Sequence, residues 1–517
     1  MICFRRTSLI LLKLIQVPLL LLLLAAMPLS FAASGDAPDN LQNWHDAIAD
    51  GYDINSAEVD GTTLLMRAIH ERNTPLARLL IESGADVTIT NRYGITALIL
   101  AARRGNAEIV RGLLDAGANP NTINLEGESV LMAAARTGSV ETINALMEGS
   151  EHYLGLAADP NAKDGWKGQT ALMWAAGMGH TAAVKALLAG GARIDEESTV
   201  INIAPVDPEY YQGGFVYTNI PKGRMTALLF ATREGHLDTV KALIAAGADI
   251  NAVDNEGTSA LVLATLNGHL DIAGLLLEAG ADPDISDRWG RNLLFVATDL
   301  NTMDANPRPT PMPLDTLKPV DIVRLALAKG ADPALALESG LPPWMVVGAT
   351  HNPILNKGST PFFRAAMSGD LAIMRMLIDA GADPMKGTDE REAMGMGGNM
   401  RTSNGGTTPF MVAAGVSWRE GLSRGREADA LTTLKFLLND YDPDINATNQ
   451  SGDTALHGAV TRGSAMIIEW LLEQGSDISL KNARDMTPLD IAMGNPEFGI
   501  EPNLAIADLL GKHLSAQ

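Results

Sequence analysis

The chain has 517 residues and a formal net charge of -22, with 46% hydrophobic and 19% charged residues. A chain of this length is too long to fold around one compact core, so it must form several domains or an elongated array. The composition excludes a disordered chain, and the negative charge argues against nucleic acid as a partner, because phosphate binding requires a positive surface.

The N-terminal segment has the pattern of an export signal. Arg5 and Arg6 give it a positive start, residues 19–24 are consecutive leucines, and small residues precede the expected cleavage after Ala32. The alternative is an uncleaved anchor, because residues 14–35 are uncharged and long enough to span a bilayer. We therefore expect a periplasmic or secreted protein, or one anchored at its N-terminus with the rest outside the cytoplasm.

The remaining chain has no second segment that is apolar enough to span a membrane. No membrane contact is therefore expected beyond the signal. The single cysteine, Cys3, lies inside the signal, so the mature chain would contain no disulfide and would be held together by packing alone.

A short sequence frame repeats along the chain after the signal. One copy is Thr96-Ala97-Leu98, followed by Ala101 and Gly105. Five of the ten separations between successive copies are 33 residues, and the others are 33 plus an insertion. The copies start at Thr63, Thr96, Ser129, Thr170, Thr226, Ser259, Asn292, Thr360, Thr408, Thr454 and Thr487.

Each copy of the frame predicts a short helix. The spacing of leucine and alanine places small and apolar residues on one helical face. The first residue is a good N-cap, and Pro361, Pro409 and Pro488 follow it at the first helical position, where a missing N–H costs nothing. A glycine about nine residues later ends the helix, and a second apolar helix follows.

This pattern resembles the ankyrin repeat, whose consensus includes Gly-x-Thr-Pro-Leu-His and Gly-His. Residues 452–457 read Gly-Asp-Thr-Ala-Leu-His, and Gly235-His236 matches the second part. The resemblance extends from about residue 36 to 514. It implies an all-α solenoid of about eleven helix–turn–helix units, joined by hairpin-like fingers, whose concave face binds proteins without catalysis.

The resemblance divides the chain into six parts. They are a signal peptide (1–32), a linker with a capping half-repeat (33–60), repeats 1–4 (61–195), an aromatic insertion (196–221), repeats 5–10 with insertions (222–482) and a C-terminal capping repeat (483–517). Insertions at 151–158, 196–221, 334–356 and 386–405 precede a finger, whereas those at 301–319 and 417–430 separate the two helices of one unit. The first kind is expected near the binding face.

Aromatic residues outside the frame are the candidate contacts for a protein partner. Exposed rings give rigid contact area. Those in the aromatic insertion could instead fold back over a gap in the stack, and those near the finger tips could pack on a neighbouring finger. The candidates are Tyr93, Trp166, Tyr210, Tyr211, Phe215, Tyr217 and Trp289. The acidic chain predicts a partner with a basic surface, bound more weakly at high salt.

We predict no catalytic residue, metal site or cofactor. The resemblance assigns His180, His236 and His269 to bonds with turn backbone, not to a metal. Residues 282–286 begin like a calcium loop but lack its glycine and glutamate. Three methionines between residues 394 and 400 could bind Cu(I), although a flexible loop is the simpler interpretation. The alternatives to a scaffold are a secreted factor acting on another cell and an enzyme or ligand carrier whose site the insertions form.

Overall fold

The structure is a computed structural model that describes the greater part of the chain. The described residues are 41–149, 157–201, 222–301, 315–339, 355–389, 405–416, 425–495 and 501–516. Tyr210, Tyr211, Phe215 and Tyr217, and the methionines between 394 and 400, lie outside them. None of the helices in the described ranges could serve as a membrane-spanning segment.

The described residues form pairs of short helices, preceded by a single helix α2 (Leu41–Ala49). The first helix of each pair is an inner helix: α3 (Leu64–His70), α5 (Ala97–Arg103), α7 (Val130–Thr137), α9 (Ala171–Gly177), α11 (Ala227–Arg233), α13 (Ala260–Leu266), α15 (Leu293–Asn301), α17 (Pro361–Ser368), α19 (Pro409–Ala414), α21 (Ala455–Arg462) and α23 (Pro488–Met493). The second is an outer helix: α4 (Thr74–Glu82), α6 (Ala107–Asp115), α8 (Val140–Glu148), α10 (Thr181–Ala189), α12 (Leu237–Ala245), α14 (Leu270–Glu278), α16 (Pro319–Ala328), α18 (Leu371–Asp379), α20 (Glu427–Tyr441), α22 (Ala465–Glu473) and α24 (Leu504–Ala516). The predicted all-α solenoid of helix–turn–helix units is confirmed.

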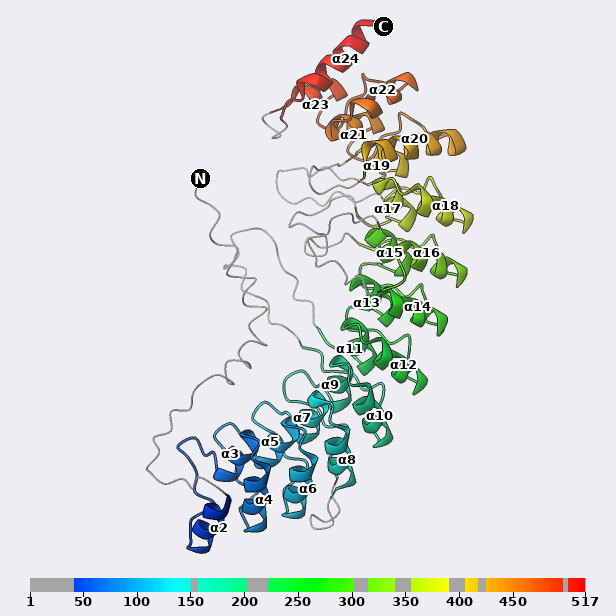
Figure 1. The fold of residues 1–517 in the computed structure, drawn as a ribbon. Coiled ribbons are helices and arrows are strands. Elements are labelled where there is room, and N and C mark those ends of the chain that lie inside the picture. Colours follow the sequence, from blue (N-terminus) through cyan, green and yellow to red (C-terminus); the bar gives the residue numbers. More distant parts are fainter. Residues whose placement is uncertain are drawn as a thin grey trace.

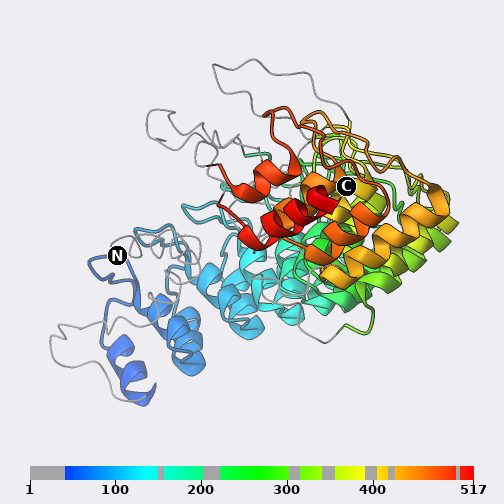
Figure 2. The same ribbon diagram turned by 90° about the horizontal axis from the view of Figure 1, so that it is seen from above.

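Successive units stack side by side into one curved array. Each inner helix contacts the next inner helix, and the outer helices from α4 to α22 likewise contact one another in succession. Figure 1 shows the inner helices on the concave side of an arc and the outer helices on its convex side. Viewed from above, the N-terminal units (blue) lie to one side of the middle units, so the stack bends instead of running straight (Figure 2).

Each inner helix begins where the repeated frame predicts. The Oγ1 of Thr96 accepts a hydrogen bond from the backbone N–H of Ile99 at 3.2 Å, and the Oδ1 of Asn292 accepts one from Phe295 at 2.9 Å. These bonds satisfy one of the N–H groups that a helix start leaves unpaired. The alanine five residues after the frame start is fully buried, as at Ala101, so neighbouring inner helices can approach closely.

The histidines after the first helix bind backbone of the preceding unit, as expected. The Nε2 atoms of His180, His236 and His269 lie 3.0 to 3.2 Å from carbonyl oxygens at the end of the previous inner helix. Gly179 shows why the pattern needs glycine beside them. Its φ is 73°, and a Cβ there would lie 2.6 Å from the His236 ring. An alanine would therefore be strained and would also clash.

A ladder of side-chain bonds joins the turns that follow the outer helices. Wherever asparagine or aspartate occupies one position of this turn, its Oδ1 accepts a backbone N–H of the next unit at 2.7 to 2.9 Å. These residues are Asn55, Asn121, Asn161, Asp195, Asn251, Asp284 and Asn446. Ala334 and Met385 hold the same position without an oxygen to offer, and the Thr88 hydroxyl donates to Asp86 instead. The segment that resembles a calcium loop thus contributes Asp284 to this ladder.

Helices α2 and α24 stand at the two ends of the described stack. Helix α2 contacts α4, so it takes the place of an outer helix before the first full unit. Trp44 is buried there, with its ring edge-on to Tyr52 at 5.4 Å between centroids. At the other end, α24 contacts α23 and runs to Ala516. Such caps cover the apolar surface that would otherwise end a stack.

Candidate protein-binding surface

The fingers precede the inner helices and project toward the concave side of the array (Figure 1). Backbone bonds between neighbouring fingers fix their positions. The N–H of Arg92 donates to Asp60 at 2.8 Å, that of Leu125 to Tyr93 at 3.4 Å, and that of Thr199 to Lys167 at 2.9 Å. These bonds tie the first finger to the second, the second to the third and the fourth to the fifth. The third and fourth fingers are in close contact, because a Cβ at Gly127 would lie 2.2 Å from the Gly165 nitrogen.

Large apolar side chains are exposed at the tips of the first four fingers. Val59 is 102% exposed, Tyr93 54%, Leu125 77% and Trp166 65%. We call these four residues the finger row. Single exposed apolar residues are ordinary, but a succession of them along one edge marks an interaction surface.

Cationic side chains accompany the aromatic members of the finger row. The guanidinium carbon of Arg92 lies 5.7 Å from the centre of the Tyr93 ring, and the Nζ of Lys167 lies 4.5 Å from the centre of the Trp166 ring. Both cations are exposed. A cation over an aromatic face is attracted to the ring, which holds ring and charge together at the tip.

Arginines of the inner helices continue this surface behind the fingers. Arg103 on α5 and Arg136 on α7 both bind the carboxylate of Glu128 at the base of the third finger. Arg136 also stacks over Trp174 on α9, at 5.2 Å from the ring centre. Glu128 is buried beneath these groups, whereas the two arginines remain partly exposed.

Several finger carboxylates are engaged within the protein. Asp164 accepts hydrogen bonds from the backbone N–H groups of Trp166, Lys167 and Gly168 at 2.6 to 3.0 Å. The N–H of Thr62 holds the pKa of Asp60 below its ordinary value. A hydrogen bond from Lys163 likewise lowers the pKa of Glu196. The carboxylates of Asp60 and Glu196 therefore stay ionised at neutral pH. All three side chains serve to shape the fingers.

Trp289 differs from the other predicted tip residues. The sequence predicts it as a partner contact, with packing on a neighbouring finger as the alternative, and its side chain is only 7% exposed. Its finger packs on the finger of the next unit, where the N–H of Glu338 donates to the Trp289 carbonyl at 2.9 Å. Packing on a neighbouring finger, the other interpretation, is the one that the structure shows.

Val59, Ile123 and Leu125 are also exposed on the fingers. They were not among the predicted contacts, because only aromatic residues were considered. Val59, Leu125 and Trp166 all stand four residues before the start of the repeated frame, and Tyr93 stands three before it. Three of the four therefore share one register, which is visible in the sequence, whereas the exposure of each tip is decided by its surroundings in the structure.

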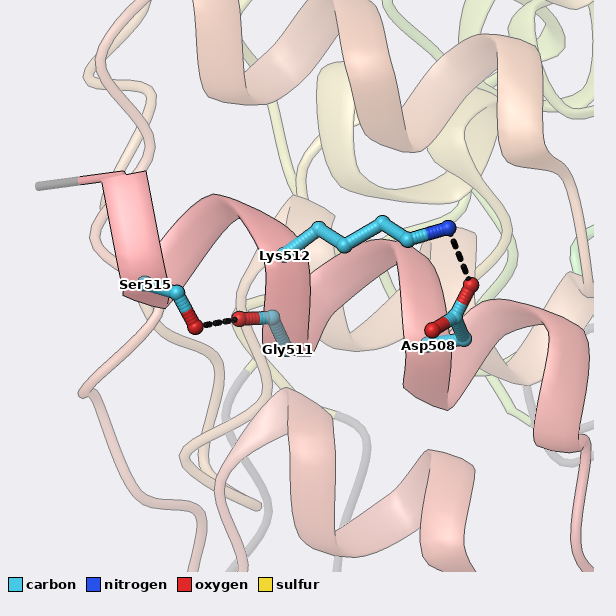
Figure 3. A pocket seen from close by; sticks show the side chains of 4 residues that line it. All are labelled: Asp508, Gly511, Lys512 and Ser515. Atoms are coloured by element: carbon cyan, nitrogen blue, oxygen red, sulfur yellow. Dashed lines mark hydrogen bonds and ion pairs between the residues drawn. The ribbon is translucent and has the colours of Figure 1, made fainter.

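The hollows on the described surface do not suggest a small-molecule site. One of them lies on the last helix and is lined by Asp508, Gly511, Lys512 and Ser515 (Figure 3). It is shallow and open, and its polar groups pair within the helix, with Lys512 on Asp508 and Ser515 on the Gly511 carbonyl. No group of three or more His, Cys, Asp or Glu side chains in the described ranges is arranged to hold a metal ion.

Comparisons with known families identify the fold. Three models of ankyrin repeats match residues 29–124, 116–198 and 212–287, then 357–386, and then 437–492. Together they match more than half of the chain, which therefore belongs to the ankyrin-repeat family. Ankyrin arrays are scaffolds for protein–protein interaction and are typically non-enzymatic, so the partner class is protein.

Individual relatives share only part of their length with this chain. Oxysterol-binding protein-related protein 1 of Mus musculus is 38% identical over 73 residues, which are 14% of this chain and 8% of that protein. Alpha-latroinsectotoxin-Lt1a of Latrodectus tredecimguttatus is 27% identical over 134 residues, 26% of this chain and 8% of the toxin. The crystal structure of the Bcl-3 ankyrin repeat domain aligns with a TM-score of 0.38 and 26% identity, over 51% of this chain and 99% of that domain.

Proposed function

We propose that this protein is a non-enzymatic scaffold that binds another protein along the concave side of its ankyrin array, outside the cytoplasm. The observation that carries the proposal is the finger row, a line of exposed apolar side chains on four consecutive fingers. Burial of such groups is the main favourable term in protein association.

The proposed location rests on the N-terminal sequence. Arg5, the leucines at 19–24 and the small residues before Ala32 form the pattern of an export signal. The test is to express the full chain, fractionate the cells and sequence the N-terminus of the recovered protein. Protein that starts at residue 33 in the periplasm or medium supports the proposal, and an intact N-terminus in the cytoplasm contradicts it.

The charge expected on the partner's surface depends on which side of the array binds the partner. The net charge of -22 predicts a basic partner. Acidic residues are frequent on the outer helices, as with Glu108, Glu141 and Glu278. A basic surface would therefore be attracted to the convex side, and this attraction would weaken with salt.

Binding is tested by crosslinked affinity capture from cell envelope and secreted fractions, with three baits. The first is the unmodified protein, the second carries Tyr93→Ala and Trp166→Ala, and the third carries Glu141→Lys and Glu278→Lys on outer helices. Recovery of a defined partner by the first and third baits but not the second is expected.

Loss of that partner with the third bait alone would move the site to the convex side. Failure of all three folded baits to recover a partner would contradict the scaffold proposal. A fourth bait, with Tyr210, Tyr211, Phe215 and Tyr217 replaced by serine, tests whether the aromatic insertion contributes to binding, which stays a prediction.

A further inference from the structure

We propose that the second, third and fourth units bind a partner segment that carries carboxylates beside apolar side chains. This inference rests on the proposed function and names the class of partner that the concave side takes. It runs against the net charge of the chain, which by itself predicts a basic partner.

The apolar part of the partner is set by the finger row. Tyr93, Leu125 and Trp166 stand on neighbouring fingers and are all more than half exposed. Ile123, on the same finger as Leu125, is exposed as well. Stacked helices are roughly 9 Å apart, so three tips span about 18 Å, the length of roughly five to six extended residues. The partner therefore needs apolar side chains spread along a segment, not one anchoring residue.

The charge of this part of the concave side is positive, although the protein is acidic. Its fingers and inner helices carry Arg92, Arg103, Arg104, Arg136, Lys163 and Lys167, against Glu126, Glu128 and Asp164. Lys163 is paired with Glu196 of the fifth finger, so five cations remain against these three carboxylates. Glu128 is buried beneath two arginines, and Asp164 is bonded to three backbone N–H groups. Of these carboxylates, Glu126 is the exposed one.

Two of the cations stand where a partner on the finger row would meet them. Arg92 and Lys167 each lie over the ring of a finger-row residue. Arg104 is exposed at the end of helix α5, where its guanidinium lies 3.1 Å from the Nδ1 of His70. A carboxylate of the partner could pair with these groups without breaking an ion pair of the protein. A lysine or arginine of the partner would instead be desolvated beside like charges, which is costly.

The surface ends at the sixth and seventh fingers. The tip of the sixth finger carries Asn255 and the buried Glu256, and the seventh carries the buried Trp289. Burial raises the pKa of Asp254, at the base of the sixth finger, above its ordinary value. Neither finger adds an exposed large apolar side chain to the row, so the combination of apolar tips and cations belongs to the N-terminal units.

The experiment is a selection of random 12-residue peptides, displayed on phage, against the purified protein expressed from the full-length chain. The selected peptides are expected to be enriched in aspartate or glutamate together with leucine, phenylalanine or tryptophan. Their affinity is expected to fall at least about tenfold with Trp166→Ala, and by about tenfold with Arg92→Glu combined with Lys167→Glu. Higher salt should weaken binding to the unmodified protein more than binding to the charge-reversed variant.

Two control variants change exposed residues of the C-terminal units. Met493→Ala removes an exposed apolar side chain from inner helix α23, and Lys357→Glu reverses a charge near the tip of the eighth finger. Both are expected to change the peptide affinity by less than about twofold, because neither residue is near the finger row.

Three outcomes overturn the inference. Selected peptides rich in lysine and arginine, or peptides that bind all variants equally, place binding elsewhere and leave the scaffold proposal intact. A dimer that dissociates with Trp166→Ala identifies a second copy of the chain as the occupant. An empty selection excludes a short segment, and the affinity capture described above then decides whether a folded partner binds instead.

Discussion

The second and seventh fingers have nearly the same local structure but opposite exposure. The second reads Asn-Arg-Tyr-Gly over residues 91–94, and the seventh reads Asp-Arg-Trp-Gly over 287–290. In both, the first side chain accepts the N–H of the aromatic residue at 3.0 Å. Nevertheless Tyr93 is 54% exposed and Trp289 is 7% exposed.

The difference comes from what stands next to each finger. Trp289 is joined to the finger of the eighth unit, and Leu337 of that finger is buried in the same hydrophobic core. Arg291 closes the other side, with its guanidinium 5.4 Å from the Trp289 ring and 2.7 Å from the fully buried Asp287 carboxylate. Beside Tyr93 stands Leu125, which is itself exposed. Two fingers of nearly the same sequence can thus differ, one packing against its neighbour and the other leaving its tip exposed as a candidate binding surface.

The largest expected effect is on the buried ion pair of the seventh finger. Arg291→Ala leaves the Asp287 carboxylate buried without its cation, which should cost about 3–5 kcal/mol locally. Hydrogen exchange of peptides covering residues 286–301 measures the loss, because a solenoid can open unit by unit. The matched control is Arg67→Ala, whose partly exposed pair with Glu58 contributes roughly 1 kcal/mol or less. Equal losses in both variants would show that the pair does not hold Trp289 in place.

A smaller loss of stability is expected when the turn ladder is interrupted in the N-terminal units. Asn121 accepts the N–H of Asp159 at 2.8 Å and donates to the Ala157 carbonyl at 3.0 Å. Asn121→Ala is expected to destabilise the third and fourth units by about 1–2 kcal/mol, since two bonds between units are lost. Thr88→Ala, at a position that makes no such bond, serves as the control in urea unfolding. A control that loses as much stability as Asn121→Ala would contradict the role of the ladder.

The converse substitution should strengthen the C-terminal units. Met385→Asn adds a side-chain oxygen that can accept the backbone N–H of Asp444 in the turn of the ninth unit. Asn446 accepts the N–H of Asp477 in the same way, at 2.8 Å. The expected gain is about 0.5–1 kcal/mol. Slower hydrogen exchange in residues 427–446 is the readout. Met385→Ala, which adds no oxygen, should show no such slowing, and an equal effect of both variants would exclude the bond as its cause.

The smallest effect near neutral pH concerns His457. Burial lowers the pKa of its imidazole in the folded protein. The unfolded chain therefore binds a proton more readily, and stability should fall as pH drops below the ordinary value of about 6.5. The loss is at most about 0.8 kcal/mol at pH 6 for one such group. Urea unfolding at pH 7.5 and pH 6 measures it, and His457→Gln should abolish this part of the pH dependence. Unchanged dependence in the variant would assign it to other groups.

Much of the fold was predictable because its determinants are local. Each frame begins with a capping residue and contains a small alanine for close approach, as with Thr96 and Ala101. The glycine that follows, such as Gly179, adopts a left-handed backbone that suits few other residues. Because these features recur at a fixed period, the sequence alone predicted the helix–turn–helix units and the structural histidines.

The finger row was predicted only in part. Tyr93 and Trp166 were recognised because they are aromatic, whereas Val59 and Leu125 are indistinguishable by residue type from core residues. Their register relative to the frame was available in the sequence, but register alone does not determine exposure. Trp289 has the same register as Tyr93 and is buried.

The sequence by itself therefore determined the repeat and the start of every inner helix. The tertiary structure decided which finger tips face solvent and where the concave side is positive. The physical reason is that capping and turn formation depend on residues within one unit, whereas burial of a tip depends on the finger of the next unit. For Trp289 that neighbour is Leu337, nearly fifty residues further along the chain.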